Sequence, residues 1–543
     1  QRVVIALALA SNPALLILDE PTTGLDATVE AAVLDLVAEL RREYEAAILF
    51  ISHNLAIVAR MCDRIGVLYA GRMVEEGPTR QVFSAPRHPY TLGLLGCVPR
   101  FGVRKDSVRL VPIRGQMPGP GARGGSCTFA PRCPYVRDRC RQSEPPLLEP
   151  EPGRHSRCFF WNELPPTAAD YIAQISEAQA TTPRDTEEQG GHPAAPRAPV
   201  LVTDQLAKTF SGGDGRVVQA VAGVSLQVRR GRTFGLVGES GSGKSTLARV
   251  VAGLLPATAG RVSLDGKDVT MVVERRSRDT LKRLQMVFQS PEATLNPQHR
   301  VGSILARSVR SFTGLRGAAL RERIQMLAAS VNLDPALLDR YPRQLSGGQR
   351  QRVAIARAFA GDPELVLCDE PASALDVSVQ AAILNLLVDI QEQRKASYIF
   401  ISHDLTVVRY LADDIGVMYL GQLVEVGPAE RVFAPPFHPY TELLFSAIPT
   451  LELTAAHAAP SGRATAGMPA QAADGPQLTA GEALQPTGCP FRLRCPRVLG
   501  PKCAEDPPWR PTADGHAIRC WIPVETLAED QRTLGAGSTV GAQ

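Results

Sequence analysis

One glycine-rich loop in this chain has the residue types and the spacing of a phosphate-binding site. It reads G-x-x-x-x-G-K-S and lies between residues 232–237, which predict a short buried strand, and a helical pattern at 246–255. In this context, backbone N–H groups and the partial positive charge at the helix start can surround phosphate oxygens. We expect Lys244 to reach the β- and γ-phosphates of a nucleotide and the Ser245 hydroxyl to bind Mg²⁺. The predicted phosphate contacts are Gly238, Glu239, Ser240, Gly241, Ser242, Gly243, Lys244, Ser245 and Thr246.

A second apolar run ends in two carboxylates. Residues 365–368 are apolar and are followed by Asp369 and Glu370. A carboxylate at the C-terminal end of a parallel strand lies where open α/β sheets bind ligands. We therefore expect Asp369 to join the Mg²⁺ shell, usually through water, and Glu370 to act as the general base that orients an attacking water. Without the neighbouring glycine-rich loop, caps or ion pairs would be the simpler interpretation of such a pair.

Part of the region that contains these motifs, including the two carboxylates, occurs twice in the chain. Gln1 corresponds to Gln351, Glu20 to Glu370, His53 to His403 and His88 to His438, so each pair is 350 positions apart. Such self-similarity indicates two copies of one module. The second copy begins near residue 200, and on this offset the first copy lacks about 150 residues, its glycine-rich loop among them. We therefore expect the chain to be part of a longer protein.

Length and composition fit a soluble protein with several domains. The chain has 543 residues, 44% hydrophobic and 21% charged, which suggests three or four domains with real cores. A net charge of +4 gives no case for a nucleic-acid binder, which would carry a strongly basic domain. No uninterrupted apolar window is long enough to span a membrane. The nearest, residues 3–18, instead predicts a buried helix followed by a buried strand.

A short segment between the loop and the carboxylates indicates a narrower family. Leu345, Ser346, Gly347, Gly348 and Gln349 resemble the signature motif of ABC ATPases. The other elements of that family follow in order, with Gln289 as the Q-loop, residues 373–376 as the D-loop and His403 as the switch histidine. The resemblance implies an α/β fold of P-loop NTPase cassettes and the hydrolysis of ATP with Mg²⁺.

The resemblance also implies a role for each matching residue. Gln289 would present its amide oxygen to Mg²⁺ or water, His403 would donate to the γ-phosphate, and Phe210 would stack on adenine. Glu20 and His53 would serve the first copy as Glu370 and His403 serve the second. In the family, two cassettes face each other head to tail, and the signature of one, here Ser346–Gln349, faces the γ-phosphate bound by the other. With one loop and one signature, this chain is expected to bind ATP at Lys244 but to hydrolyse it poorly.

Further segments narrow the resemblance to the oligopeptide and dipeptide importers. Residues 289–297 resemble the extended Q-loop of that group, 88–91 and 438–441 the start of its C-terminal extension, and 126–134 and 488–496 its Cys motif. This implies two integral-membrane permease subunits and a solute-binding protein as partners, at the cytoplasmic face of the plasma membrane, with no nucleic acid. Peptides, nickel complexes and glutathione all remain open as the transported solute.

The expected domains follow from the repeat and from two stretches rich in Pro, Ala and Thr. Each cassette is followed by a Cys-bearing extension, and the second cassette is complete, with a helical subdomain and an antiparallel β part. The units are 1–87, the C-terminal part of the first cassette; 88–164, its extension; 165–199, a linker; 200–437, the second cassette; 438–525, its extension, with a low-complexity insert; and 526–543, a tail.

Eight of the eleven cysteines form two matched sets. Four thiolates per set in a reducing compartment indicate a metal centre rather than disulfides, and zinc and [4Fe–4S] both accept four cysteines. The absence of a C-x-x-C knuckle and the family resemblance favour the iron–sulfur cluster over zinc, and an extension without metal is the third alternative. The sets are Cys127, Cys133, Cys140 and Cys158, and Cys489, Cys495, Cys503 and Cys520.

Two other classes of protein share some of these features. A soluble ABC ATPase without a membrane partner would carry different inserts and would lack the His-Pro-Tyr extension at 88–90 and 438–440. A degenerate remnant with little activity of its own would fit the incomplete first copy. The first is tested by co-purification with membrane subunits and the second by turnover of the purified chain.

Overall fold

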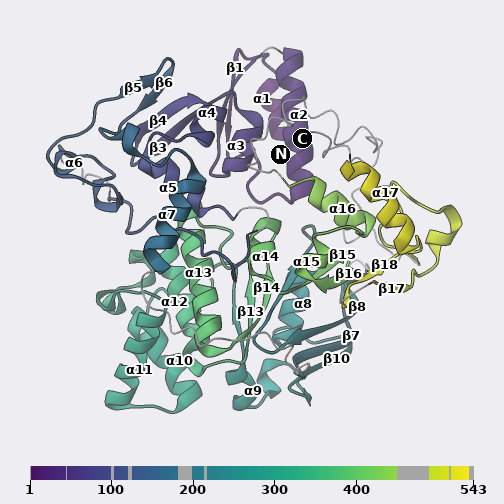
Figure 1. The fold of residues 1–543 in the computed structure, drawn as a ribbon. Coiled ribbons are helices and arrows are strands. Elements are labelled where there is room, and N and C mark those ends of the chain that lie inside the picture. Colours follow the sequence, from purple (N-terminus) through teal and green to yellow (C-terminus); the bar gives the residue numbers. More distant parts are fainter. Residues whose placement is uncertain are drawn as a thin grey trace.

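The computed structural model describes residues 2–44, 46–99, 103–119, 125–180, 198–212, 217–448, 488–512 and 515–536. In Figure 1, the elements of residues 2–180 lie together at the top and those of residues 198–448 form the body below them. The chain has a mixed α/β architecture. Within the described ranges, no helix is both long enough and apolar enough to cross a membrane.

The body is built around a mixed eight-stranded sheet of order β12-β13-β14-β9-β15-β16-β18-β17. Pairing is parallel from β12 to β15 and antiparallel beyond it. β9 and β13 are buried at every position, which explains their apolar runs. Because parallel strands end at one edge, the loop after β9 meets the carboxylates after β13. The strands are β9 Thr233–Val237, β12 Leu284–Val287, β13 Leu365–Asp369, β14 Ser397–Ile401, β15 Asp414–Tyr419, β16 Gln422–Pro428, β17 Trp509–Pro511 and β18 Ala517–Arg519.

The helix after the glycine-rich loop lies between two sheets. α8, Lys244–Val251, contacts β13 and β14 of the main sheet and also β7 and β8 of a second, antiparallel sheet of order β11-β10-β7-β8. Leu247 and Val251 of α8 are buried in one core cluster with residues of both sheets. The start of this helix is therefore fixed from two sides. The second sheet consists of β7 Pro199–Ser211, β8 Val217–Arg229, β10 Ala259–Leu264 and β11 Lys267–Asp268.

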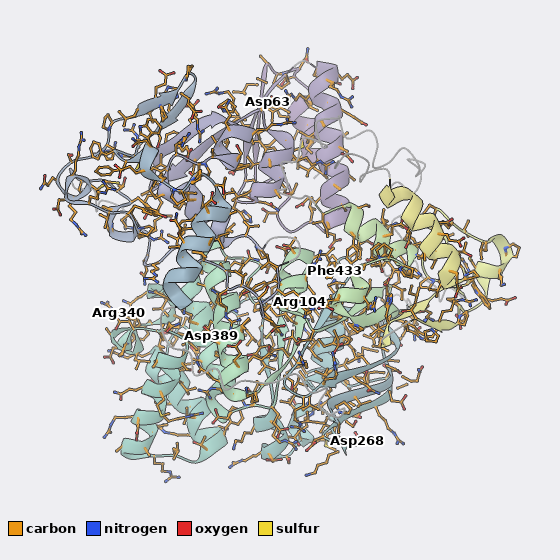
Figure 2. The ribbon with its side chains drawn as sticks, viewed as in Figure 1. Asp63, Arg104, Asp268, Arg340, Asp389 and Phe433 are labelled. Carbon is orange, nitrogen blue, oxygen red and sulfur yellow. The ribbon has the colours of Figure 1, made fainter. Side chains whose placement is uncertain are left out.

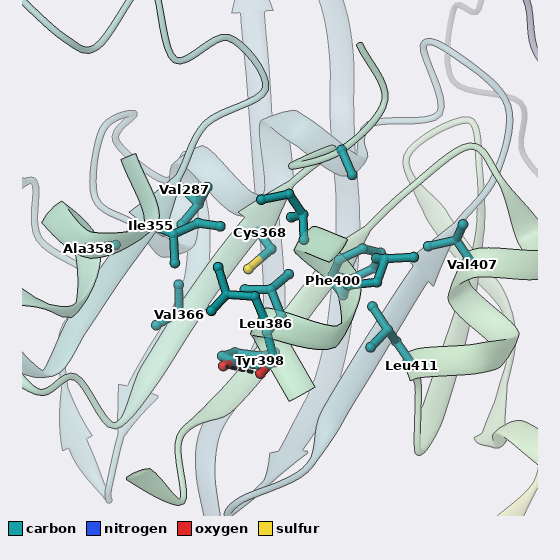
Figure 3. Close-up of a cluster of buried hydrophobic side chains, with 14 of the residues drawn as sticks. Val287, Ile355, Ala358, Val366, Cys368, Leu386, Tyr398, Phe400, Val407 and Leu411 are labelled. Atoms are coloured by element: carbon teal, nitrogen blue, oxygen red, sulfur yellow. Dashed lines mark hydrogen bonds between the residues drawn. The ribbon is translucent and has the colours of Figure 1, made fainter. Parts of the chain in front are cut away.

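Helices pack on the main sheet and position the remaining motifs. In Figure 3, Val366 of β13 lies in one buried cluster with Ile355 of α12 and Leu386 of α13. The Tyr398 hydroxyl donates to the Leu387 carbonyl at 2.9 Å, which satisfies the polar end of that buried ring. The helices are α9 Arg278–Arg283, α10 Val301–Thr313, α11 Gly317–Ser330, α12 Gly347–Ala358, α13 Val377–Arg394, α14 Leu405–Leu411, α15 Ala429–Val432, α16 Pro439–Ser446 and α17 Val524–Ala536.

The N-terminal part shares its element order with the second half of the body. β3 and β4 pair in the same register as β15 and β16, and both ladders shift at equivalent residues, Val67 and Val417. Glu20 and Glu370 both have a left-handed backbone, with φ of 46° and 47°. The elements are α1 Arg2–Leu9, β1 Leu15–Asp19, α2 Ala27–Tyr44, β2 Ala47–Ile51, α3 Leu55–Met61, β3 Arg64–Tyr69, β4 Arg72–Pro78, α4 Thr79–Ser84, α5 Pro89–Cys97, α6 Asp138–Gln142, β5 Leu148–Glu151, β6 Arg154–Ser156 and α7 Ala168–Ala180.

The helix and strand predicted over residues 3–18 form, but one face of them is not buried. Leu15 and Ile17 of β1 are 51% and 59% exposed, whereas the equivalent Leu365 and Leu367 of β13 are at most 1% exposed. The difference arises because α8 and the second sheet cover β13. The prediction of burial is wrong for this face, since periodicity shows that a face is apolar but not what covers it.

The two repeats pack on each other reciprocally. α5 of the first repeat contacts α13 of the second, and α16 of the second repeat contacts α2 of the first. α5 and α16 are equivalent helices 350 positions apart, and so are α2 and α13. Figure 1 shows α5 directly above α13, and α16 close to the lower end of α2. Each extension therefore begins with a helix that packs against the other repeat.

A segment that follows α5, residues 103–111, crosses onto the second repeat and is called the docking segment below. Lys105 is 6% exposed. Its ammonium donates to Asp413 at 2.8 Å, to Gln391 at 3.1 Å and to Thr233 at 3.3 Å. A buried ammonium is tolerated only with such partners, so this lysine fixes the first extension to the base of β9.

Ion pairs surround this buried contact. Arg104, labelled near the centre of Figure 2, pairs with Glu430 at 3.0 Å. Arg109 pairs with Glu392 at 2.5 Å and with Asp389, also labelled there, at 3.5 Å. The docking segment thus lies against both α13 and α15.

Two expected boundaries differ from the observed elements. Residues 168–180 of the segment predicted to be a linker form α7, which packs on α5 and buries Tyr171; residues 181–197 lie outside the described residues. α17 continues across the boundary predicted at residue 525. The second extension also joins the main sheet, because β18 pairs with β16.

Candidate functional site

The glycine-rich loop has a backbone that only glycine can adopt at two positions. Gly238 has φ of 147°, and a Cβ there would lie 2.2 Å from the Met418 carbonyl oxygen. Gly243 has φ of 100°, and a Cβ there would lie 2.2 Å from the Ala220 carbonyl oxygen. These glycines allow the loop to pass close to two neighbouring strands and to turn into α8.

Lys244 is held inside the curve of this loop. Its ammonium donates to the carbonyls of Gly238 and Glu239 at 2.7 Å each and to the Ser242 hydroxyl at 3.2 Å. Burial lowers the pKa of Lys244, and the nearby carboxylates oppose that shift. The loop therefore concentrates positive charge at the start of α8.

The two predicted Mg²⁺ ligands at this edge are in direct contact. The Ser245 hydroxyl at the start of α8 donates to Asp369 Oδ1 at 2.9 Å. Burial raises the pKa of Asp369, while the hydroxyl of Ser245 opposes the rise. A hard cation prefers oxygen ligands such as these, so the pair could hold Mg²⁺ against a phosphate in the loop.

The predicted general base of the second copy has two polar neighbours. Gln289 Nε2 donates to Glu370 Oε2 at 2.9 Å, and His403 Nδ1 lies 3.3 Å from the same oxygen. The hydrogen bond from His403 lowers the pKa of Glu370, and the same bond raises the pKa of His403. Glu370 is therefore an ionised carboxylate at neutral pH, as a base must be.

The first copy contains the equivalent pair. His53 Nδ1 lies 2.8 Å from Glu20 Oε1, and the His53 backbone N–H donates to the same oxygen at 3.0 Å. Burial by itself would raise the pKa of Glu20, but the hydrogen bonds from His53 and Thr23 lower it overall. The geometry of Glu20 and His53 thus matches that of Glu370 and His403.

Residues of the first copy contact the glycine-rich loop of the second. The Ser240 backbone N–H donates to Asp26 Oδ1 at 2.6 Å. The Thr28 hydroxyl donates to Glu239 Oε1 at 2.5 Å. Asp26 belongs to the segment of the first repeat that matches the D-loop. A carboxylate and a hydroxyl from one copy therefore lie at the phosphate loop of the other.

The signature segment and Phe210 make local contacts. The Gln349 N–H donates to Ser346 Oγ at 3.3 Å and the Ser346 N–H to Gln349 Oε1 at 2.9 Å, a capping box that starts α12 at Gly347. Phe210, at the end of β7, is 40% exposed, and the Lys208 ammonium lies 5.0 Å above its ring. The hydrogen bonds of Ser346 and Gln349 join them to each other and not to the glycine-rich loop.

Two residues that contact the glycine-rich loop were not predicted from the sequence. The Glu239 N–H donates to the Tyr440 hydroxyl at 2.9 Å. Arg494 donates to both carboxylate oxygens of Glu239, at 2.8 and 3.0 Å. Tyr440 and Arg494 belong to the second extension. Both residues recur in the first extension, as Tyr90 and Arg132, and this recurrence is the feature of the sequence that could have identified them.

The cysteines of each set gather, but without the spacing of a metal site. Those of the first set line one cavity of about 20 Å³ beside Phe129 and Leu164. Burial raises the pKa of Cys133 and Cys158 to about 12. Among the described residues, which include all eight cysteines, no group of three or more potential ligands could hold a metal ion. The predicted metal centres are not supported by this geometry.

Comparisons with known proteins agree with these motifs. The family model described as ABC transporter matches residues 221–373. The model described as Oligopeptide/dipeptide transporter, C-terminal region, matches residues 74–140 and 424–503. The second model therefore matches once in each repeat.

The relatives with similar sequences are named as ATP-binding proteins of transport systems. The Oligopeptide transport ATP-binding protein OppD of Mycobacterium tuberculosis is 41% identical over 457 residues, which are 83% of this chain and 72% of that protein. The same protein of Mycobacterium bovis has the same values. The Glutathione import ATP-binding protein GsiA of Pectobacterium atrosepticum is 36% identical over 458 residues, which are 83% of this chain and 64% of that protein. The chain belongs to the ABC transporter ATP-binding proteins with an oligopeptide/dipeptide-type C-terminal region, and it is an ATPase of that family.

Proposed function

We propose that this chain is the subunit that binds ATP at Lys244 and, within the assembled importer, hydrolyses it to power the import of di- or oligopeptides, or of similar solutes such as glutathione, through a membrane permease. The proposal includes two integral-membrane permease subunits and a solute-binding protein as partners. It places the chain peripherally at the cytoplasmic face of the plasma membrane. The names of the relatives and the two matches to the transporter C-terminal region support it.

The observation that carries the proposal is the set of contacts at the ends of β9 and β13. Lys244, the Ser245–Asp369 pair and Glu370 with its two neighbours lie at one sheet edge. Lys244 would exchange its loop acceptors for the β- and γ-phosphates. Ser245, Asp369 and Gln289 would hold Mg²⁺, which neutralises phosphate charge when bound.

The hydrolytic roles follow from the same geometry. Glu370 would orient the attacking water, and His403 would donate to the γ-phosphate. Phe210 would stack on adenine from the end of β7. The signature residues Ser346–Gln349 would meet a nucleotide held by the other cassette, because an N-terminal helix turn attracts anions.

We also propose that the repeats are two ABC cassettes with one extension each, packed head to tail. The reciprocal contacts of α5 with α13 and of α16 with α2 support this arrangement. So does the hydrogen bond from Ser240 in the second repeat to Asp26 in the first. Glu20 and His53 would then belong to a second nucleotide site.

A binding experiment tests the nucleotide site. Lys244→Ala is expected to abolish binding of a fluorescent ATP analogue to the purified chain, because the only ammonium inside the loop is lost. Lys267→Ala, an exposed lysine on β11, is the matched control and should bind as the unaltered chain does. Unchanged affinity in Lys244→Ala would refute the proposed site.

A second experiment distinguishes the importer from a soluble ABC ATPase. The importer predicts that the chain co-purifies with two integral-membrane subunits from membranes of its source, and that Lys244→Ala abolishes solute uptake by the complex. A chain that never associates with membrane subunits, yet turns over ATP, would support the soluble alternative.

A further inference from the structure

Glu239, in the glycine-rich loop, is the point at which three parts of the molecule meet. Its side chain accepts two hydrogen bonds from Arg494 of the second extension and one from Thr28 of the first repeat. Its N–H donates to Tyr440, also in the second extension, and its carbonyl accepts from Lys244. Every polar group of this one loop residue is therefore engaged.

The pair between Arg494 and Glu239 is partly buried and bidentate. The side chains of the two residues are 12% and 14% exposed. Parallel N–H···O bonds from a guanidinium to a carboxylate fix both distance and orientation, and they are stronger than neutral hydrogen bonds. This contact therefore restricts the loop, unlike an exposed ion pair, which contributes little.

Arg494 is itself held in place. Its guanidinium lies 5.9 Å from the ring centroids of both Tyr419 and Phe491. Arg494 and Phe491 belong to the short segment between Cys489 and Cys495. Tyr419 belongs to β15, next to β9 in the main sheet. A charged group stacked on two rings loses little freedom when it binds, so the arginine is oriented toward the loop in advance.

The first extension offers an internal comparison. Arg132 occupies the position equivalent to Arg494 and also lies over a tyrosine, Tyr69, at 5.8 Å. It donates instead to the carbonyls of Ile113 and Arg114 at 3.2 and 2.9 Å. The aromatic platform is common to both copies, while the contact to a phosphate loop is made by Arg494.

We propose that Arg494 is a positioning residue for nucleotide binding, which fixes the position of the glycine-rich loop by anchoring Glu239. This inference rests on the proposed nucleotide site at Lys244. Because Lys244 donates to the carbonyl of Glu239, a displacement of Glu239 also displaces the ammonium that must reach the phosphates. The second extension thereby acts on ATP affinity without touching ATP.

The test measures affinity of the complete chain for a fluorescent ATP analogue. Arg494→Ala is expected to weaken binding about tenfold, equivalent to about 1.4 kcal/mol. Arg494→Lys should recover part of this loss, since an ammonium keeps the charge but not the bidentate geometry. Glu239→Ala should weaken binding to the same extent, and the double variant should be no weaker than either single variant.

Control variants separate positioning from general stability. Arg497→Ala removes a neighbouring arginine of the same extension that pairs with Glu442, at 2.5 and 3.0 Å, and not with the loop. Arg132→Ala removes the equivalent arginine of the first extension. Both should bind the analogue with unaltered affinity, and Arg494→Ala should unfold at the same temperature as Arg497→Ala.

The possible failures are distinguishable. If Lys244→Ala loses binding while Arg494→Ala and Glu239→Ala keep normal affinity, the role of Arg494 is refuted and the nucleotide site stands. Additive losses in the double variant would also refute it. If Lys244→Ala keeps normal affinity, the proposed site fails and the inference fails with it. Should Arg494→Ala not fold, Arg494→Lys and Glu239→Ala decide the question by the same measurement.

Discussion

Removal of the Lys105 ammonium should release the docking segment from the second repeat. We consider Lys105→Met, which keeps the aliphatic stem and deletes the charge together with three hydrogen bonds. Asp413, whose side chain is 3% exposed, would keep the Thr233 N–H at 2.7 Å and Arg232 at 3.1 Å. Asp413 would thus lose its nearest opposite charge but would keep these two hydrogen-bond donors.

The expected change in the free energy of opening depends on the partners that remain around Asp413. Removal of one partner from a fully buried ion pair is destabilising by about 3–5 kcal/mol. Since Arg232 still faces the carboxylate, we expect about 2–3 kcal/mol for local opening of the docking segment. The carboxylate pKa, which Lys105 and its other partners keep low against burial, should rise in the variant.

Hydrogen exchange at two backbone amides measures this opening directly. The Lys105 N–H donates to the Tyr410 carbonyl at 3.0 Å, and the Leu110 N–H donates to Asn385 Oδ1 at 3.2 Å. Both bonds cross between the repeats, so exchange requires the segment to leave the second repeat. A change of 2–3 kcal/mol corresponds to about 30- to 160-fold faster exchange at both amides.

Two further variants make the result decisive. Asp413→Asn combined with Lys105→Met should restore part of the protection, because the carboxylate is then no longer left with a missing partner. Lys267→Met, on the exposed strand β11, should leave both amides unaffected. Exchange in Lys105→Met that differs by less than about twofold from the unaltered chain would refute the assigned role of this lysine, since removal of one partner leaves the other charge of the pair buried, which is costly.

Three more predictions concern the base, the buried histidines and the cysteines. Glu370→Gln is expected to lower ATP turnover by about 10²- to 10⁴-fold while nucleotide stays bound; unchanged phosphate release would show that Glu370 is not the base. Burial lowers the pKa of His88 and His438 to about 3 from an ordinary 6.5. The unfolded chain therefore takes up protons first, and each histidine should decrease the free energy of unfolding by about 2 kcal/mol between pH 6.5 and pH 5. His438→Gln, which keeps an acceptor for the Tyr440 N–H, should remove one histidine's share of that slope in urea unfolding, and an unchanged slope would contradict the assignment. An anaerobic preparation with broad absorbance near 400 nm and with iron would support the cluster predicted at the Cys sets, whereas metal-free protein would agree with the finding that no metal-holding group of ligands occurs among the described residues.

The sequence by itself determined those features that depend on neighbouring residues or on a simple period. The glycine-rich loop between an apolar run and a helical pattern predicted the strand, turn and helix around Lys244, because phosphate cradles need that local order. The largely apolar segments before Gly238 and Asp369 predicted buried parallel strands, and parallel strands end at one edge. The offset of 350 residues predicted a second Glu–His pair, and His53 contacts Glu20 through the same ring nitrogen, Nδ1, that His403 turns toward Glu370.

The tertiary structure alone decided which surfaces meet. A lysine in a polar segment after α5 reads as exposed, yet Lys105 is buried because Asp413 lies opposite it, 308 positions away. Helix α7 forms where the composition indicates a linker, since α5 offers a surface that buries Tyr171. In the same way, the pairing of Arg494 with Glu239 joins residues 255 positions apart. Such contacts depend on long-range packing, which no local period encodes, and they determine how the extension reaches the phosphate loop.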